Sequence, residues 1–481
     1  MLQFFQNFFG CNPQADDSRG VTTKDLITFK QAPISNHYTL DQSPIGIGSI
    51  SIVKKGTHRL TGQIRAIRIL KKSQINEEKL RKEIKILKNL DHPNILKIYE
   101  VIYDTENFYI VSDLCTGKEL FEHIEKKGII SEEFAARIMK ELLSAITYLH
   151  NNGIAHLNIK PESLRFESEL KEGMIKITNF ANADSISDYE PFKDFVGTPE
   201  YVAPEMIDGL YNNSVDVWAC GITLFMILVG QAPFTGKNKQ AILKAIKENP
   251  LEFKDEIWKE VSVEAKDLIT KMLNKDLSQR ITAQDALNHE WFKAKLTEKK
   301  IDRQAACKTL ERLKSFRINK KIQSAIWTFM EHYLATKEEK GRLLEIFQAL
   351  DTNNDGQLSK EELKEGFDKF FVKGSKVISI DKIFKNLDKN HNETIDYTEF
   401  VTAVLDKDLL ISQDNLRITF NLLDADGNGK ISIQELQDAF GAESVFFEEA
   451  YWKELVKEAD REGDGEIGFN EFVELMAGLK V

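Results

Sequence analysis

The sequence predicts an α+β fold over the larger, N-terminal part of the chain, followed by an all-α domain. From Tyr38 onward, short β-branched runs around a glycine-containing turn give way to long segments whose apolar residues recur every three or four positions. The last part of the chain instead repeats a twelve-residue acidic loop four times, each copy between apolar helical segments. We therefore expect a sheet, a helical region and a separate helical domain, in that order.

Composition sets the broad class of protein. The 481 residues are 42% hydrophobic and 29% charged, which is typical of a folded chain of about two to four domains. No apolar run reaches the roughly 18 residues of a membrane span. The cysteines are too scattered for a metal cluster or a disulfide framework, so we expect a reducing, cytoplasmic location. They are Cys11, Cys115, Cys220 and Cys307.

Negative charge is concentrated at the C-terminal end. The net charge is −11, and residues 341–481 hold 16 Lys and Arg against 30 Asp and Glu. Such a region is either a solvated acidic surface or a set of carboxylate ligands for a hard cation. The spacing described below favours the cation, and we expect no nucleic-acid partner.

Residues 1–37 are expected to form a variable N-terminal tail. Its first ten residues are rich in phenylalanine, and Leu2 excludes N-myristoylation. Membrane contact, with an acylated Cys11, is one interpretation, although no basic residue precedes Arg19. A tail that docks on its own protein is the other, simpler interpretation. A signal peptide is not expected because the positive start is missing.

The first strands surround a glycine turn. Gly46 and Gly48 lie between β-branched residues, and glycines let backbone amides approach phosphates closely. Ser51 stands where a third glycine would complete the motif, and Val53 follows in the next strand. This segment resembles the glycine-rich loop of protein kinases, with a Cβ crowding one position.

The next strand and helix carry a paired charge. Residues 64–68 predict a strand that ends at Arg68, and residues 77–90 predict a helix containing Glu83. These positions resemble the lysine and glutamate of the kinase ion pair. Arginine can still pair with Glu83, but its planar fork cannot replace a compact ammonium on the phosphates. Two further helices are predicted at residues 120–127 and 131–151.

The segment from His156 to Leu164 resembles a kinase catalytic loop without two of its working residues. Lys160 is present, but Asn158 stands at the general base, and an amide has no basic lone pair near neutral pH. Ser163 stands at one magnesium position and Asn179 at the other. Arg165 falls where the family has an apolar residue under the adenine ring.

The structural positions of the kinase family are nevertheless present. Glu205, in an A-P-E segment, and Arg280 are expected to pair, and residues 216–221 also match. The resemblance covers residues 38–292 and implies a bilobal protein-kinase fold. It also implies nucleotide and magnesium positions, where Mg-ATP binding is doubtful. These are Gly46, Gly48, Val53, Arg68, Glu83, Ser163 and Asn179.

The junction at residues 296–334 is basic and amphipathic. Within residues 308–333, apolar side chains recur at spacings of three and four, with Lys320 and Lys321 on the remaining arc. Such a helix is what a calmodulin-like domain grips, so we expect an autoinhibitory-like segment with this domain as its intramolecular partner. The alternative is a helix that only spans two domains.

Residues 340–481 contain four loops with the spacing of calcium-binding EF-hands, at 351–362, 388–399, 424–435 and 460–471. The first and third are complete. Glu393 replaces the glycine at position 6 of the second loop, and a left-handed backbone there costs roughly 1–2 kcal/mol. In the fourth loop, Glu462 places a longer side chain at position 3 than the Asn or Asp residues of the other three loops. The position-8 residues are all apolar, as two short β-bridges require.

The spacing assigns five calcium-ligand positions to each loop. They are Asp351, Asn353, Asp355, Gln357 and Glu362; Asp388, Asn390, Asn392, Thr394 and Glu399; Asp424, Asp426, Asn428, Lys430 and Glu435; and Asp460, Glu462, Asp464, Glu466 and Glu471.

Together these features resemble the calcium-dependent protein kinases of plants and protists. In that family, calcium makes the calmodulin-like domain seize the junction and remove it from the kinase cleft. Here the sensor is intact and the catalytic residues are replaced, which predicts a calcium-sensing pseudokinase acting on an unidentified protein partner. An active serine/threonine kinase, rescued by Lys160, Glu162 or Asp184, is an alternative. A calcium buffer with a relic domain is a third.

Overall fold

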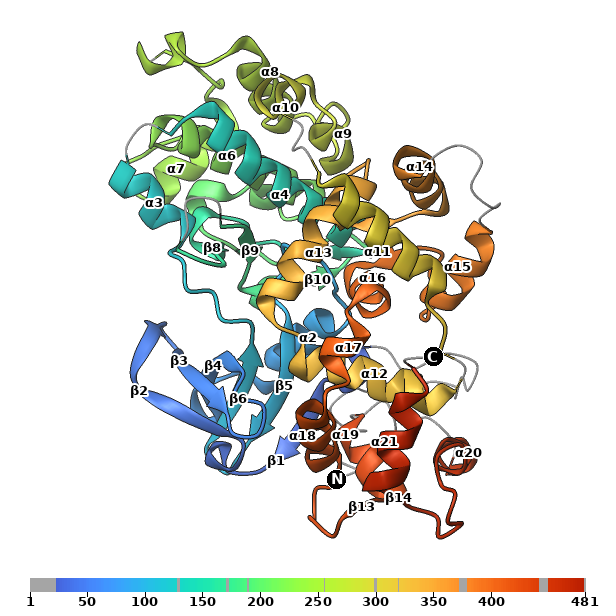
Figure 1. Cartoon of the computed structure of the whole chain (residues 1–481). Coiled ribbons are helices and arrows are strands. Elements are labelled where there is room, and N and C mark those ends of the chain that lie inside the picture. The colour runs from blue at the N-terminus through green and yellow to red at the C-terminus, as the bar shows by residue number, and fades with distance from the viewer. Residues whose placement is uncertain are drawn as a thin grey trace.

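The computed structural model describes residues 23–127, 130–169, 173–187, 190–254, 256–297, 301–318, 320–371, 379–440 and 449–479. Its N-terminal lobe is a six-stranded sheet in the order β1-β5-β6-β4-β3-β2, with helix α2 beside it (Figure 1). The strands are β1 Thr28–Gln31, β2 Tyr38–Ile47, β3 Ser51–His58, β4 Ile64–Lys71, β5 Ile98–Tyr103 and β6 Asn107–Ser112, and α2 is Glu77–Lys88. All pairs are antiparallel except β1 with β5.

The N-terminal segment differs from the expected tail. Residues 1–22 lie outside the described residues, and with them the proposed membrane contact and Cys11. Thr23–Leu26 and Ile34–Asn36 form 3₁₀ turns, η1 and η2, on either side of β1. Because Ile27 and Phe29 are buried against the kinase-like region, this segment belongs to the first lobe rather than to a tail ending at residue 37.

The second lobe is helical, with α4 and α6 at its centre. Helix α4 packs against α6 and α9, and α6 packs against α8. Ser131 caps α4 by accepting a hydrogen bond from the Phe134 amide at 3.3 Å. The helices are α3 Leu120–Lys127, α4 Glu132–Asn151, α5 Pro204–Asp208, α6 Ser214–Val229, α7 Lys239–Glu248, α8 Val263–Met272, α9 Ala283–Leu287 and α10 Glu290–Lys295.

Short strands and turns between the lobes carry the catalytic-loop positions. The strands are β7 Ile154–Ala155, β8 Leu164–Phe166, β9 Ile175–Ile177 and β10 Asp184–Ser185. The 3₁₀ turn η4 Pro161–Ser163 lies between β7 and β8, η5 Phe180–Asn182 lies between β9 and β10, and η6 Pro199–Tyr201 follows β10. The strand pairs are β8 with β9 and β7 with β10.

The junction forms two helices where one was predicted. Helix α11 spans Arg303–Ser315 and α12 spans Lys321–Leu334, with extended backbone at Phe316 and Lys320 between them. The break lets the two helices pack on partly different partners: both contact α16, but α11 contacts α13 and α14, whereas α12 contacts α17, α18 and α20.

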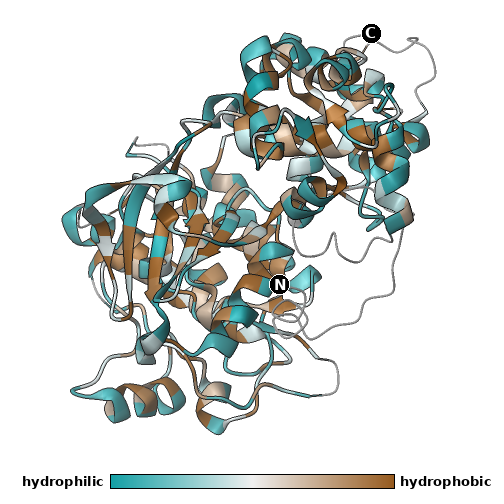
Figure 2. Cartoon of the chain, turned by 90° about the horizontal axis from the view of Figure 1, so that it is seen from below, coloured by the Kyte–Doolittle hydropathy of each residue, from teal (hydrophilic) through white to brown (hydrophobic). Residues whose placement is uncertain are grey.

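In its described residues, the C-terminal domain is all-α apart from two short two-stranded bridges. Leu358 pairs with Ile395 and Ile431 with Ile467, which confirms the predicted pairing of the position-8 residues. The hydrophobic sides of the helices turn inward (Figure 2). The elements are α13 Lys337–Leu350, β11 Gln357–Leu358, α14 Lys360–Phe370, α15 Ile380–Leu387, β12 Ile395–Asp396, α16 Tyr397–Val404, α17 Lys407–Leu410, α18 Gln413–Leu423, β13 Lys430–Ile431, α19 Ile433–Ala439, α20 Glu449–Lys457, β14 Ile467–Gly468 and α21 Phe469–Ala477.

Among the described residues, every helix is too short or too polar to cross a bilayer.

Candidate functional site

The ion pair predicted between the first strands and helix α2 is present. The Arg68 Nη2 atom lies 2.8 Å from Glu83 Oε2, joining β4 to a helix whose N-terminus is capped by Asn76. Glu83 is almost completely buried and Arg68 is about a quarter exposed. The guanidinium therefore holds α2 against the sheet. Next to it, Gly46 pairs with Val53, and the Gly48 amide donates to the Ser51 carbonyl at 2.8 Å.

The catalytic-loop backbone is held by Asp216 of α6. Its carboxylate accepts hydrogen bonds from the backbone amides of His156 and Leu157, each at 2.8 Å, and lies 3.1 Å from His150 Nε2. Burial would raise the pKa of Asp216, but the hydrogen bonds and charges of His150 and His156 lower it. Leu157 takes a left-handed φ of 61° within this arrangement. The loop therefore keeps its shape independently of the residue at the base position.

The residues at the metal positions do not fit magnesium. The Ser163 hydroxyl donates a hydrogen bond to the Lys160 carbonyl at 2.8 Å and accepts one from the Lys160 amide at 3.1 Å. Its hydrogen-bonding groups are therefore engaged by the backbone of Lys160. Asn179 has φ 64° and ψ 63° and offers an amide instead of a carboxylate. Lys160 Nζ donates to Thr198 Oγ1 at 3.0 Å. Magnesium prefers carboxylates and phosphates, so this set is poorly suited to hold it.

Two carboxylates near these positions, Asp184 and Glu119, form ion pairs, whereas the Glu162 Oε2 atom, next to Ser163, is buried and has no hydrogen-bond partner. Asp184 pairs with Lys82 at 2.5 Å. Arg165 Nη2 lies 2.8 Å from Glu119 Oε1, with both side chains about one third exposed. The sequence placed Arg165 at the adenine position but gave no signal that Glu119 would neutralise it. The Arg165–Glu119 salt bridge therefore lies at the position where the resemblance places an apolar residue under the adenine ring.

All four acidic loops close in the same way. In each loop, the backbone amide of position 6 donates to the carboxylate of position 1. The distances are 2.9 Å for Gly356 to Asp351, 3.1 Å for Glu393 to Asp388, 2.9 Å for Gly429 to Asp424 and 2.8 Å for Gly465 to Asp460. The loops therefore share one backbone turn whatever the residue at position 6.

That turn needs left-handed backbone at two positions. At position 6, Gly356, Gly429 and Gly465 have φ of 82°, 87° and 83°, and Glu393 is forced to 63°. At position 4, Gly427 and Gly463 are left-handed, but so are Asn354 and His391 at 57° and 58°. The left-handed backbone predicted at Glu393 is confirmed. A second strained residue, His391, was not predicted, because the pattern of these loops does not specify a residue type at position 4.

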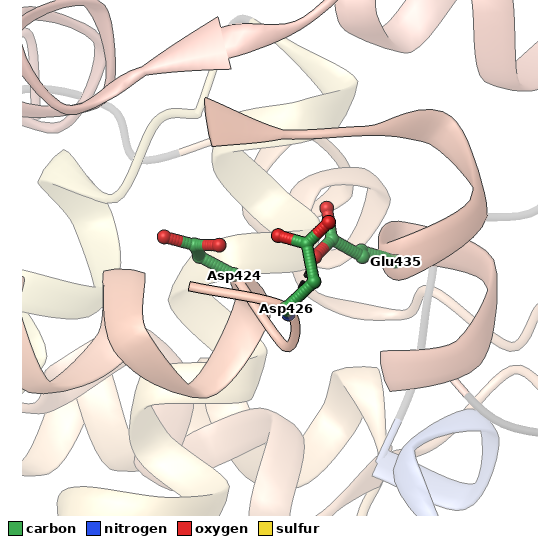
Figure 3. A group of neighbouring side chains, drawn as sticks. All are labelled: Asp424, Asp426 and Glu435. Atoms are coloured by element: carbon green, nitrogen blue, oxygen red, sulfur yellow. Dashed lines mark hydrogen bonds between the residues drawn. The ribbon is translucent and has the colours of Figure 1, made fainter. Parts of the chain in front are cut away.

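The third loop gathers the carboxylates most closely. Asp424, Asp426 and Glu435 each offer an oxygen within 4.8 Å of the others (Figure 3). The Asp424 Oδ1 and Asp351 Oδ1 atoms are buried and have no hydrogen-bond partner. Burial, Asp355 and Glu362 raise the pKa of Asp351 well above its usual value. Buried oxygens without donors need a cation, so the first and third loops fit calcium.

The glutamates at position 12 close each loop from the other side. Glu362 accepts hydrogen bonds from the Thr352 and Ser359 amides, each at 2.9 Å, and Glu435 accepts from Ala425 and Ser432, each at 2.8 Å. Glu399 and Glu471 accept from the corresponding amides of their loops. The remaining predicted ligands lie in the same loops. In the pair of loops 3 and 4, Lys430 forms an ion pair with Asp464.

The first loop pair also contacts the kinase-like region. The Thr398 amide and hydroxyl donate to Asp91 at 3.0 and 2.8 Å, and Lys97 donates to the Thr398 hydroxyl at 3.0 Å. Gly356 packs so closely on the His92 ring that a Cβ would overlap it. Thr398 is adjacent to the ligand position Glu399. Nothing in the loop spacing indicates such a contact.

Helix α12 is buried on all sides between the lobe and the C-terminal domain. Of the predicted apolar residues Ile318, Ile322, Ala325, Ile326, Phe329, Met330 and Tyr333, all are buried except Ile318, which precedes the helix and is half-buried. Trp327 and His332, on the other faces, are buried as well. The Trp327 indole donates to the Thr402 carbonyl at 2.7 Å, and His332 packs on Tyr99 of β5 with ring centroids 4.9 Å apart. The calmodulin-like domain and the first lobe share this helix (Figure 1).

A kinase-type bilobal domain joined to two pairs of EF-hand loops is the class of protein that this fold and these sites define. Residues 39–292 match the protein kinase domain family, and residues 340–405 and 413–477 match the EF-hand domain pair. Calcium-dependent protein kinase 4 of Plasmodium falciparum (isolate 3D7) is 37% identical over 453 residues, 90% of this chain and 85% of that protein.

Two further relatives resemble the chain to a similar degree. Calcium-dependent protein kinase 5 of the same organism is 36% identical over 481 residues, 98% of this chain and 83% of the relative. Calcium-dependent protein kinase 3 of Plasmodium berghei (strain Anka) is 35% identical over 450 residues, which cover 92% of this chain and 80% of that relative. The chain belongs to the calcium-dependent protein kinase family, and its EF-hands indicate calcium binding.

Proposed function

We propose that this chain is a calcium-sensing pseudokinase, which responds to calcium by a change of conformation and passes it on by binding a protein partner. The observation that carries the proposal is the separation between scaffold and chemistry in the cleft. Asp216 and the Arg68–Glu83 pair hold the active-type backbone. Asn158, Ser163 and Asn179 offer neither a base nor a metal carboxylate.

The proposed calcium ligands are the side chains at positions 1, 3, 5 and 12 of each loop and the backbone carbonyl at position 7. Loops 1 and 3, which contain Asp351 and Asp424, are the strong sites, one in each pair. Loop 2 is the weakest because Glu393 and His391 are both left-handed. Loop 4 binds with Glu462 reaching from position 3.

Helix α12 is the element that carries the signal. It is gripped by the second loop pair, where Gln323 donates to the Leu475 carbonyl at 2.5 Å and Phe329 packs on Phe440 at 6.0 Å. EF-hand sensors change the angle between their helices on binding calcium. A change in the second loop pair therefore alters the surface that α12 packs against, whether or not the cleft is catalytic.

An active calcium-regulated kinase is the second candidate. The Arg68–Glu83 ion pair and the left-handed Asn179 favour it, since both belong to an assembled kinase site. The relatives carry the name calcium-dependent protein kinase. On this alternative, Lys160 and Arg68 would neutralise phosphate charge in place of the missing metal ligands.

One experiment separates these functions. The purified full chain is incubated with labelled Mg-ATP and a generic protein substrate, with calcium or with a chelator, and hydrogen exchange of α12 is followed in parallel. A pseudokinase sensor gives no transfer and a calcium-dependent change in α12. Calcium-stimulated phosphate transfer identifies an active kinase. If there is neither phosphate transfer nor a calcium-dependent change in α12, the chain is a calcium buffer.

A further inference from the structure

The short N-terminal segment Thr23–Gln31 contributes to two different hydrophobic cores. Leu26 is completely buried among α12 and the helices of the C-terminal domain. The neighbouring Ile27, together with Phe29, is buried in the core of the kinase-like region. An ordinary edge strand packs on its own domain alone, so a segment whose consecutive side chains enter separate cores joins those cores.

The strand within this segment is fixed to the sheet by a buried ion pair. Strand β1 runs parallel to β5, with Thr28 opposite Glu100 and Gln31 opposite Tyr103. Lys30 Nζ lies 2.9 Å from the Glu100 carboxylate, which is fully buried and also accepts from the Tyr38 hydroxyl at 2.5 Å. Burial would raise the pKa of Glu100, but Lys30 and Tyr38 lower it to about 2. Removing Lys30 would leave a buried charge without its partner.

The opposite side of the segment is covered by α12. The turn η1 packs directly on that helix. Tyr333, near its C-terminal end, is buried, with its ring 6.4 Å from the His58 ring of β3. Burial raises the pKa of the Tyr333 hydroxyl to about 12. A four-residue strand is marginal on its own and depends on such packing.

We propose that residues 23–31 form an N-terminal strap that holds α12 against the first lobe, and that the strap in turn stays in place only while α12 is docked. Coupling between two sites is reciprocal, so each element stabilises the other. If α12 moves away, Leu26 loses the apolar residues that bury it, and β1 loses the helix that covers one side of this segment. The strap then opens. The calcium dependence of that release rests on the proposed function, whereas the coupling does not.

The test uses two shortened chains at a fixed, saturating calcium concentration. One lacks residues 1–22 and keeps the strap, and the other lacks residues 1–31. Hydrogen exchange is measured in α12 and β5, with α4 as the internal reference for global unfolding. We expect loss of residues 1–31 to raise exchange in α12 and β5 at least about tenfold, as for loss of a buried apolar contact. Loss of residues 1–22 alone should leave both unchanged.

Point variants keep the test decisive if the shorter chain does not fold. Leu26→Ser should raise exchange in α12, and Tyr333→Ser should raise exchange in residues 28–31. Gln31→Ser, at an exposed position of the same strand, is the matched control and should change neither. Unchanged α12 exchange in both Leu26→Ser and the chain lacking 1–31 would overturn the strap. If these variants do raise exchange in α12, but removal of calcium with a chelator leaves α12 exchange unchanged in the wild type, the strap stands and the calcium switch is overturned.

Discussion

In the interlobe cleft, the contacts that hold the backbone are present and the side chains that would perform the chemistry are replaced. In the acidic loops, both backbone and ligands are present. Asp216 still orders the catalytic loop around Asn158, and the position-6 amides still close every calcium loop on its first aspartate. On the proposed function, the geometry of the cleft is kept by residues that do not react. A fold match therefore indicates function only where the reactive groups are also present.

The largest expected effect tests the catalytic side of this comparison. With the base and both metal ligands replaced, phosphotransfer should be absent or at least about 10⁴-fold below the usual rate of roughly 1–100 s⁻¹. The measurement is transfer from labelled Mg-ATP at saturating calcium. Asn158→Asp with Asn179→Asp should not restore transfer, because Arg68, Ser163 and Arg165 remain. Calcium-stimulated turnover that disappears in Lys160→Ala would contradict the prediction.

The second effect tests the sensor side. Glu362→Gln with Glu435→Gln removes one charge from the calcium shell of each strong loop. A carboxylate charge at roughly 2.4 Å from a divalent ion contributes about 3 kcal/mol even in bulk water, so calcium affinity should fall about 100-fold per loop. The calcium-induced change in α12 hydrogen exchange should disappear at calcium concentrations that saturate the wild type.

The matched control for that pair is Glu361→Gln, an exposed residue beside Glu362 that lies outside the ligand set. It should titrate like the wild type. Exchange in α12 that is insensitive to calcium in the wild type itself would mean that the chain is not a switch.

Much of both regions could be predicted from local pattern. Helix α4, its Ser131 cap, the paired position-8 residues and the Arg280–Glu205 ion pair at 2.5 Å all follow from spacing or from the family motif. Features that depend on distant partners could not be predicted. A four-residue strand with a lysine in it gives no signal that Lys30 will meet a buried Glu100 seventy positions away.

The same limit explains the errors in the junction and the cleft. A continuous apolar periodicity predicted one helix, but tertiary partners on two sides break it between Ser315 and Lys321. Arg165 lies in β8, and its ion pair with Glu119 joins residues 46 positions apart. The contact of Thr398 with Asp91 joins residues 307 positions apart. Local pattern indicates which face is buried, and only the assembled fold shows against what.

A third effect concerns nucleotide in the cleft. We expect weak Mg-ATP binding, with a calorimetric Kd above the low micromolar range, because Arg165 puts a charge at the adenine floor and Asn179 is a poor metal ligand. Arg165→Leu should tighten nucleotide binding about tenfold, which is about 1.4 kcal/mol. Glu119→Gln breaks the same ion pair but keeps the arginine, so it should give no gain. Low micromolar binding of Mg-ATP by the wild type would contradict this account.

The smallest effect compares loops within the sensor. Loop 2 differs from loop 3 in holding Glu393 and His391 where loop 3 has Gly429 and Gly427, all with left-handed φ. A left-handed non-glycine residue costs roughly 1–2 kcal/mol, so Glu393→Gly should raise the calcium affinity of loop 2 about 5- to 30-fold. Gly429→Ala should lower that of loop 3 by a similar factor. Calorimetric titration of each variant counts the sites and their affinities. If Glu393→Gly changes neither, backbone strain does not limit loop 2, and its ligand Asn390, which lacks the charge of Asp426 at the same position of loop 3, sets its affinity instead.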